Sequence, residues 1–245
     1  MGDGIGREFL ERTKYRYLDI SDQRKGVPQP PIVLPVPPDR PVFVLPDPAS
    51  TGLAPVDLAG LIEKRRSLRR YAGTPLSLAE LSFLLWTTQG IKEAAAVGTL
   101  RTVPSAGARH AFETWLLLNR VETLEPGLYR YLPLDHKLAL LRTDPGLKAQ
   151  VTAACLGQTF IESAAALFLW VAIVDRMTWR YGDRGYRYLY LDAGHICQNL
   201  YIGAEAIGAG ACAIAAFDDE AVNTVLEIDG KDQIALYLAA VGKRA

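Results

Sequence analysis

Cysteine and histidine are scarce in this chain, and their scarcity excludes several kinds of site. The 245 residues contain three cysteines, none of them in a C-x-x-C pair: Cys155, Cys197 and Cys212. An odd, sparse set predicts buried thiols in a reducing compartment and no disulfide framework. The three histidines lack the i, i+4 spacing of helical metal ligands, so we expect no metal: they are His110, His136 and His195. A packing or interface role is the simplest interpretation of His195.

Neither sign of charge predominates, and no apolar stretch is long. Lys and Arg number 27, as do Asp and Glu, which argues against nucleic acid as a partner. The longest apolar run, from Ala164 to Val174, has 11 residues, too few to cross a bilayer. The N-terminus lacks the apolar core of a signal peptide. We therefore expect a soluble cytoplasmic protein with no nucleic acid or membrane partner.

Several familiar motifs of catalysis and nucleotide binding are missing. Ser105 lies in Val-Pro-Ser-Ala-Gly, which lacks the first glycine of the G-x-S-x-G hydrolase motif. The glycines from Gly203 to Gly210 do not follow a strand and open a helix, as a dinucleotide-binding turn requires. No P-loop is present either. A phosphate-bearing ligand would have to be held in another way.

Proline is concentrated near the N-terminus. Nine of the 15 prolines fall between Pro28 and Pro48, and proline fixes φ and removes an amide donor, which excludes a helix or a central strand there. Residues 1–53 are predicted to form an extended Pro-rich N-terminal arm. A disordered linker is one interpretation. Because apolar residues such as Ile32 and Phe43 alternate with the prolines, the other is an arm packed on a surface of its own chain or of a partner.

Residues 54–245 are predicted to form one α+β domain. A helix is expected from Pro55, and the capping box Ser77-Leu-Ala-Glu80 begins a second helix that ends near Gly90. Irregular alternation of helices with hairpin signals favours α+β over a doubly wound sheet. A loop is expected at 91–110, and strands are expected at 114–118, 128–132, 138–141, within 164–174, at 211–216 and at 234–241. Two further helices are expected, one at 184–207 that Gly208 ends and one at 218–226 that Asp218 caps.

Four arginines surround one serine in Arg65-Arg66-Ser67-Leu68-Arg69-Arg70-Tyr71. Arginine presents a rigid fork of donors that matches phosphate. Arg65, Ser67 and Arg69 stand at alternate positions, so they can face one ligand together. The alternative is a solvated basic helix end, where cations complement the helix dipole.

Further motifs follow the arginine cluster in order, and together they carry a resemblance. In sequence they are Arg101-Thr-Val-Pro104-Ser105-Ala106-Gly107-Ala-Arg-His110, Arg184-Gly-Tyr-Arg-Tyr188, Asp192-Ala-Gly-His195-Ile-Cys-Gln-Asn-Leu200, Ala204 to Gly210, Phe217-Asp-Asp219 and Val241-Gly-Lys243-Arg244. This pattern resembles the nitroreductase family, and within it the SagB/ThcOx-type branch, over about residues 54–245.

The resemblance implies FMN as cofactor and a homodimer. Nitroreductases have a central, mainly antiparallel sheet flanked by helices, and they form intertwined homodimers with FMN at the interface. Transferred by position, the backbone amides of Ala215 and Ala216 would face the flavin N5 and O4. The Ser105 loop would reach the flavin of the partner subunit. The family also implies ping-pong hydride transfer from NAD(P)H to a small acceptor.

The residue types fit FMN as well. Cations are needed at its phosphate, hydroxyls at its ribityl chain, and small side chains where its ring lies flat. The candidate cofactor-binding residues are Arg65, Arg66, Ser67, Arg69, Pro104, Ser105, Ala106, Gly107, Ala215, Ala216, Lys243 and Arg244. For Lys243 and Arg244, an ordinary charged tail is the alternative.

The segment Arg180-Tyr181-Gly-Asp-Arg184 departs from the azoline oxidases that it resembles. Those enzymes carry Lys-Tyr where this chain carries Arg180 and Tyr181. Arginine, unlike lysine, essentially cannot act as a base. If a side chain supplies the catalytic proton, we expect Tyr181 to donate it and Arg180 to orient the substrate. The alternative is that Tyr181 only packs near the mouth of the pocket. The alternatives to the nitroreductase-like function are an azoline dehydrogenase of a peptide natural-product pathway and a non-enzymatic flavin-binding module.

Overall fold

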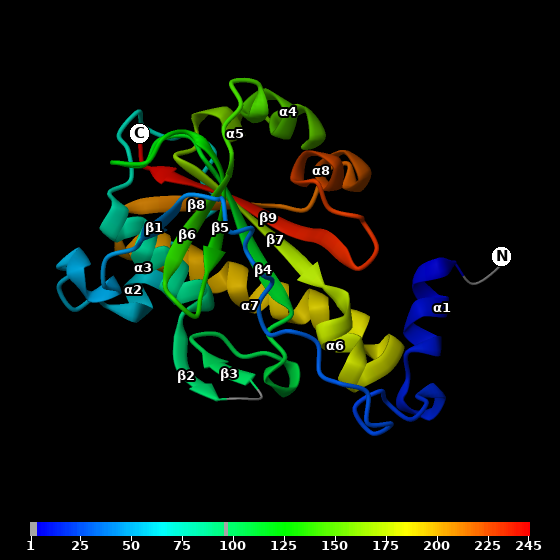
Figure 1. Ribbon diagram of the computed structural model, residues 1–245. Helices are drawn as coiled ribbons and strands as arrows, with labels where there is room; N and C mark the ends of the chain where they lie inside the picture. Colours follow the sequence, from blue (N-terminus) through cyan, green and yellow to red (C-terminus); the bar gives the residue numbers. More distant parts are fainter. Residues whose placement is uncertain (1–3, 96–97) are drawn as a thin grey trace.

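The computed structural model describes residues 4–95 and 98–245, so residues 1–3 of the predicted arm and 96–97 of the predicted loop lie outside the described residues. At its centre lies a seven-stranded sheet in the order β1-β6-β5-β4-β7-β9-β8 (Figure 1). All neighbouring strands in this sheet are antiparallel, which confirms the α+β prediction. The strands are β1 (Val42–Val44), β4 (Phe112–Leu118), β5 (Gly127–Leu132), β6 (Lys137–Arg142), β7 (Ala166–Ile173), β8 (Ala209–Ile214) and β9 (Gln233–Lys243).

Helices cover both faces of this sheet. The α-helices are α1 (Ile5–Arg12), α2 (Leu58–Lys64), α3 (Leu78–Gln89), α4 (Leu147–Ala154), α5 (Phe160–Ser163), α6 (Val174–Tyr181), α7 (Gly185–Ala206) and α8 (Asp219–Leu226). Short 3-10 helices are η1 (Tyr15–Tyr17), η2 (Pro48–Thr51), η3 (Ala106–Ala108) and η4 (Gly182–Arg184). Figure 1 shows α4, α5 and α8 on one face and α3, α6 and α7 on the other. None of the helices that the structure describes is long and apolar enough to cross a membrane.

The central strand β7 shows why two cores form. Its side chains alternate between the faces, because successive residues of a strand point in opposite directions. Phe168 and Trp170 join the core that contains α3 and α7, whereas Leu167 and Leu169 join the core beneath α4 and α8. All four side chains are fully buried. An apolar run such as 164–174 is therefore the expected sequence of a strand covered on both sides, and its prediction as a central strand is confirmed.

The helix boundaries follow local capping. Ser77 and Glu80 form the predicted capping box at the start of α3, and Asp218 accepts a hydrogen bond from the Ala221 amide at 2.8 Å at the start of α8. The predicted start of α2 at Pro55 is wrong. Asp57 caps that helix through the amides of Ala59 and Gly60, because an aspartate side chain satisfies amides that a proline cannot.

A hairpin occupies the segment that was predicted as a loop at 91–110. Strand β2 (Ile91–Ala95) pairs with β3 (Gly98–Arg101) in a separate two-stranded sheet. The Thr102 amide donates to the Gly90 carbonyl at 2.9 Å, and buried Arg101 donates to the Gln89 side chain at 2.7 Å. These contacts fix the base of the hairpin to the end of α3. The loop prediction is wrong for this part because alanine and glycine gave no strand signal.

The Pro-rich arm packs on its own chain. Arg130 donates to the carbonyls of Leu34 and Pro35 at 3.1 and 2.7 Å, and the Leu34 amide donates to the buried Glu113 carboxylate at 2.8 Å. Strand β1, which lies between Pro41 and Pro46, then adds to the sheet edge beside β6, where nearby prolines are tolerated. These contacts favour the packed arm over the disordered linker. Helix α1, however, precedes the prolines, so this arm is not extended throughout.

Candidate functional site

The arginine cluster runs as an extended segment along the free edge of β8. The Leu68 amide donates to the Ala211 carbonyl at 2.8 Å, and the Leu68 side chain covers Gly210. A β-carbon at Gly210 would lie 2.6 Å from that side chain, so only glycine permits this approach. Arg65 and Ser67 contact Tyr201 of α7, whereas Arg69 stands over Phe160 of α5, which covers the other face of the sheet.

Tyr201 joins this segment to the strand. Its hydroxyl lies 2.9 Å from the Ser67 hydroxyl and accepts the Ala213 amide at 2.8 Å. The Arg65 guanidinium stands over the Tyr201 ring at 5.2 Å. Tyr201 belongs to α7 and is buried. Sequence reasoning missed this residue, because a tyrosine at a core position of a helix carries no distinguishing signal.

Two guanidinium groups of the cluster are available to an anion. Arg69 stands over the Phe160 ring at 5.9 Å, and Arg65 over Tyr201. Among residues 4–95 and 98–245, neither guanidinium forms a hydrogen bond or an ion pair. Arg65 is half-buried, whereas Arg66, Arg69 and Arg70 are exposed. Cations held over aromatic rings without a carboxylate partner suit an anionic ligand.

The two basic residues near the C-terminus are engaged with carboxylates. Lys243 forms an ion pair with Glu80 and donates to the Ile207 carbonyl at 2.9 Å. Arg244 pairs with Glu205. They fasten the end of β9 to α3 and to the end of α7. If Lys243 and Arg244 also bound a phosphate, these carboxylates would compete with it for their positive charge.

The predicted second loop, residues 104–107, is fixed to the middle of α7. The Ser105 hydroxyl accepts the His110 amide at 2.9 Å, and the Ala106 amide donates to the Asp192 carboxylate at 3.2 Å. Gly107, Ala108 and His110 all have positive φ, at 57°, 53° and 44°. A strained turn of this kind persists only where its surroundings hold it, and such turns concentrate at functional sites.

Asp192 and His110 are buried behind this loop. Burial raises the pKa of Asp192, although hydrogen bonds from Ser105 and Ala106 oppose the rise. Its second oxygen has no partner among the residues that the structure describes, and the His195 ring nitrogen lies 4.0 Å from its first oxygen. Burial, followed by the charge of Arg101, lowers the pKa of His110 to about 3. His110 is therefore neutral at pH 7.

The predicted catalytic pair packs directly against the same loop. A β-carbon at Gly107 would lie 2.4 Å from the Tyr181 hydroxyl and 3.1 Å from the Arg180 Nε. Tyr181 also meets Tyr188 edge-on at 4.8 Å. Arg109 donates to the Gly107 carbonyl at 3.1 Å. The fold thus brings together two motifs that are more than seventy positions apart in the sequence.

Helix α7 carries both parts of the candidate site at separate points. Asp192 holds the Ser105 loop, and Tyr201 holds the arginine cluster. Nine residues of an α-helix correspond to a rise of about 13.5 Å. The loop and the cluster of one chain are therefore spaced along α7 and do not meet.

Ala215 and Ala216 follow β8, which ends at Ile214, two residues earlier than predicted. The Ala213 amide points away from β9 toward Tyr201. Ala215 and Ala216 lie beyond the end of the strand, so their amides take no part in the β8–β9 ladder. Both alanines are exposed, and the Ala216 carbonyl accepts a hydrogen bond from Gln158 at 2.7 Å. Unpaired cations, a free edge amide and small side chains fit the groups that FMN presents.

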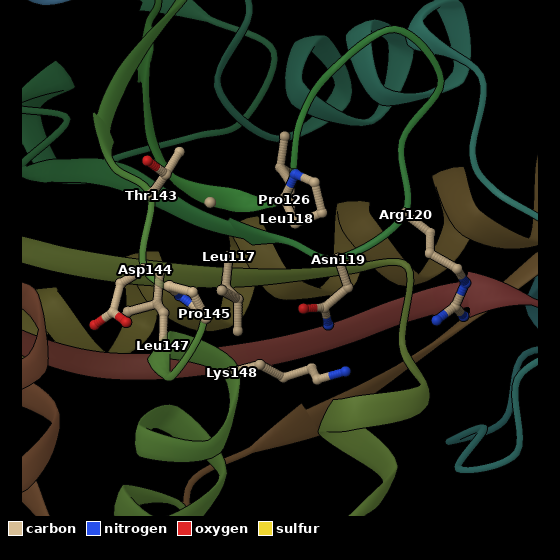
Figure 2. Close-up of a pocket in the computed structure, with 11 residues that line it drawn as sticks. Leu117, Leu118, Asn119, Arg120, Pro126, Thr143, Asp144, Pro145, Leu147 and Lys148 are labelled. Atoms are coloured by element: carbon tan, nitrogen blue, oxygen red, sulfur yellow. The ribbon is translucent and has the colours of Figure 1, made fainter.

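A separate cavity of about 540 Å³ lies at the C-terminal end of β4 (Figure 2). Its lining includes Asn119, Arg120 and Lys148, and none of the predicted site residues. Among the described residues, no three His, Cys, Asp or Glu side chains are grouped so that they could hold a metal ion. This cavity therefore does not belong to the predicted site.

Comparisons with known proteins agree on one family. The model of the nitroreductase family matches residues 62–243. A Methanocaldococcus jannaschii protein that bears the name nitroreductase MJ1384 is 34% identical over 189 residues, covering 77% of this chain and 92% of that protein. The trifolitoxin-processing protein TfxB of Rhizobium leguminosarum bv. trifolii is 29% identical over 133 residues, covering 53% of this chain but only 36% of TfxB. A crystal structure from Ralstonia eutropha JMP134, named as a nitroreductase, has a TM-score of 0.69 and 27% identity, and the match covers 87% of this chain and 95% of that one.

Proposed function

Because the chain belongs to the nitroreductase family, and its relatives fit the SagB-type branch, we propose that it is an FMN-dependent oxidoreductase. In this proposal it transfers hydride from NAD(P)H to a small-molecule acceptor in two half-reactions at one site. Bound FMN would supply the hydride-carrying chemistry, and the protein would position the reactants and tune the site. We also propose the cytoplasm as its location, since its cysteines are free and buried.

The observation that carries this proposal is the Tyr201 hydroxyl. It ties Ser67 of the arginine cluster to Ala213 on the free edge of β8. A single ligand lying along this edge would therefore meet cations at one end and backbone amides at the other. FMN has a phosphate and a ring edge in that relation. Amides aimed at a ring edge stabilise negative charge that develops there.

We assign the predicted cofactor-binding residues to three regions. The phosphate would be held by Arg65, Arg66, Ser67 and Arg69, with Lys243 and Arg244 contributing while they remain paired with carboxylates. The ring edge would lie against the amides of Ala215 and Ala216. The opposite side would be covered by the loop of Pro104, Ser105, Ala106 and Gly107.

A second copy of the chain would supply that loop. The loop and the arginine cluster of one chain are held at separate points of α7, and in the proposed dimer the loop would reach the flavin of the partner subunit. Helix α7 also exposes Tyr186, Tyr190 and Leu191, at 36%, 59% and 58% of their surfaces. Exposed apolar residues on one helix indicate an interface. We therefore propose a homodimer in which each site combines residues of both chains.

Tyr181 would donate the proton that accompanies hydride transfer to the acceptor. Its hydroxyl lies against the Gly107 turn, and Arg180 lies beside it. Arg180 would orient the substrate and would not act as a base, because arginine stays protonated.

The proposal is tested by the visible spectrum of the purified protein, followed by anaerobic titration with NADH and NADPH. We expect a flavin spectrum that is bleached by one or both nicotinamides and restored by a nitroaromatic acceptor. A colourless protein that cannot be reconstituted with FMN would refute the proposal. Bound flavin that neither nicotinamide reduces would indicate a non-enzymatic flavin-binding module.

An azoline dehydrogenase is the second candidate function. It is favoured by the similarity to TfxB, whose name describes trifolitoxin processing. This activity would remove two hydrogen atoms from an azoline ring in a peptide. Incubation of the flavin-loaded protein with an azoline-containing peptide, followed by mass spectrometry, tests it directly. An unchanged peptide mass, under conditions in which nitroaromatics are reduced, would exclude this candidate.

A further inference from the structure

The N-terminal segment builds one wall of a cavity at Tyr181. This cavity has a volume of about 740 Å³, within the range of small-molecule sites. One side is formed by Arg180 and Tyr181, and the other includes Tyr15, Asp19 and Arg24. The nitroreductase family model begins to match at residue 62. The wall therefore lies outside the part of the chain that defines the family.

Hydrogen bonds hold the C-terminal half of this wall against α6. The Gln23 amide donates to the Trp179 carbonyl at 2.9 Å, and the Trp179 indole donates to the Val27 carbonyl at 2.8 Å. The Lys25 amide closes a turn on the Ser21 carbonyl at 3.0 Å. Arg24 lies inside this doubly anchored turn, so its backbone has a defined position opposite Arg180.

The N-terminal half of the wall is held against η4 and the start of α7. Arg184 donates to the Thr13 carbonyl at 2.8 Å and stands over the Tyr15 ring at 4.3 Å. The Tyr15 hydroxyl lies 3.3 Å from the Tyr188 hydroxyl. Tyr188 in turn meets Tyr181 edge-on. The aromatic wall of the cavity is thus continuous with the proposed proton donor.

Positive charge predominates around this cavity. Arg24 and Arg180 line it against one carboxylate, that of Asp19. Burial, and next the nearby charge of Arg180, lower the pKa of Arg109, which donates to the Gly107 carbonyl in the turn beside Tyr181. Among residues 4–95 and 98–245, no carboxylate forms an ion pair with Arg24, Arg109 or Arg180. Cations that are held close without an anion favour an anionic ligand.

We infer that this cavity binds the anionic group of an aromatic, carboxylate-bearing acceptor, with Arg24 and Arg180 on either side of the carboxylate and Tyr15 and Tyr181 against the ring. The inference rests on the proposed function and assigns its acceptor class. Arg24 then determines specificity from outside the family domain. The same two arginines could also bind a phosphate group, and the nicotinamide dinucleotide carries such groups.

The experiment is calorimetric titration of the flavin-loaded protein with para-nitrobenzoate and with its neutral counterpart, para-nitrobenzamide. We expect the benzoate to bind at least about tenfold more tightly than the amide. In Arg24→Gln this preference should fall by about tenfold, because one charge-assisted contact is lost. Lys25→Gln is the matched control, since Lys25 pairs with Asp22 on the surface and does not line the cavity. It should bind like the unmodified protein.

Equal binding of the benzoate and the amide would overturn the inference, as would an unchanged preference in Arg24→Gln. Stopped-flow reduction by NADPH and by NADH separates the two sources of anion. If Arg24→Gln slows reduction by NADPH alone and leaves benzoate binding intact, the cavity serves the nucleotide phosphate and the acceptor assignment is wrong. Selective benzoate binding by a protein without redox activity would instead refute the proposed function, and the cavity would then be a binding site for an aromatic carboxylate that is not an electron acceptor.

Discussion

Tyr201→Phe removes one oxygen atom that has two partners in the protein. The Ser67 hydroxyl lies 2.9 Å and the Ala213 amide 2.8 Å from it, and the tyrosine is only 8% exposed. Without the hydroxyl, the Ala213 amide on the β8 edge loses its acceptor. An orphaned donor costs about 1–3 kcal/mol. Since Ala213 is half-buried, water can replace part of the bond, so about 1–2 kcal/mol is expected.

This loss has two measurable consequences. For a domain of this size, 1 kcal/mol corresponds to about 2–4 °C in Tm, so the Tm of the flavin-free variant should fall by about 2–8 °C. Ser67 also loses the bond that fixes it beside Arg65. If the proposed phosphate site is correct, the Kd for FMN should rise about tenfold, as expected for about 1.4 kcal/mol.

Thermal unfolding of the flavin-free protein and a fluorescence titration with FMN measure the two effects separately. Tyr17→Phe is the matched control, because Tyr17 lies outside the proposed site, is 52% exposed, and its hydroxyl donates to the Glu11 carboxylate at the surface. It removes the same atom without a buried partner. If Tyr201→Phe behaved like this control in both assays, the role of Tyr201 as the tie between cluster and strand would be refuted.

Four other predictions follow from the same geometry. Arg65→Ala and Arg69→Ala should each raise the Kd for FMN by about ten- to a hundredfold, and Arg70→Ala far less; equal effects in a fluorescence titration would indicate a solvated basic face. Tyr181→Phe should slow flavin reoxidation by a proton-requiring acceptor by about a hundredfold, with reduction by nicotinamide unchanged; stopped-flow measurement of both half-reactions tests this. Because the folded state holds the pKa of His110 near 3, the unfolded chain binds one more proton between about pH 6.5 and 3. Stability is lost as pH falls through this window, and His110→Gln should flatten the slope by up to about 1.4 kcal/mol per pH unit in denaturant unfolding at a series of pH values. Finally, sedimentation should show a flavin-loaded homodimer, and a flavin-loaded monomer at micromolar concentration would contradict the shared site.

Elements with a strong local signal could be predicted from the sequence. The run from Ala164 to Val174 forms the central strand β7, because an apolar stretch of that length has to be covered on both faces. The Ser77 capping box and the Asp218 cap are local hydrogen-bond patterns. The end of α7 before Gly208 follows from a residue with a φ of 66° that glycine adopts readily. In each case, the signal lies within a few residues of the structure that it specifies.

The contacts that assemble the candidate site could not be predicted in this way. Tyr201 and Asp192 lie among the buried residues of α7, where a helical pattern marks them only as core. Their partners, Ser67 and Ala106, are 134 and 86 positions away. Sequence spacing alone does not show which distant backbone amide will need an acceptor. The residue types were predictable, but the partnership between them depends on how the helix lies on the sheet.

The Pro-rich arm shows a second limit of prediction from sequence. Proline content correctly excluded a central strand, yet it could not distinguish a linker from a packed arm. That distinction depends on Arg130 and Arg176, which donate to carbonyls of the arm at 2.7 Å. A segment without its own hydrogen-bonded structure satisfies its carbonyls with distant arginines. The sequence around an arginine in a strand or a helix does not show that it will donate to a distant carbonyl.

The pair Arg180 and Tyr181 distinguishes the two candidate reactions. Oxidation of an azoline ring requires a base that removes a proton from carbon, and arginine stays protonated and cannot serve. Reduction of an acceptor requires the opposite, a donor that supplies a proton as hydride arrives. The Tyr181 hydroxyl lies against the Gly107 turn, and the Arg180 guanidinium lies 5.8 Å from its ring. Of the two side chains, tyrosine is the one that can give up a proton, because arginine stays protonated. This arrangement therefore suits proton donation to an acceptor, and it favours the reductive function over azoline oxidation.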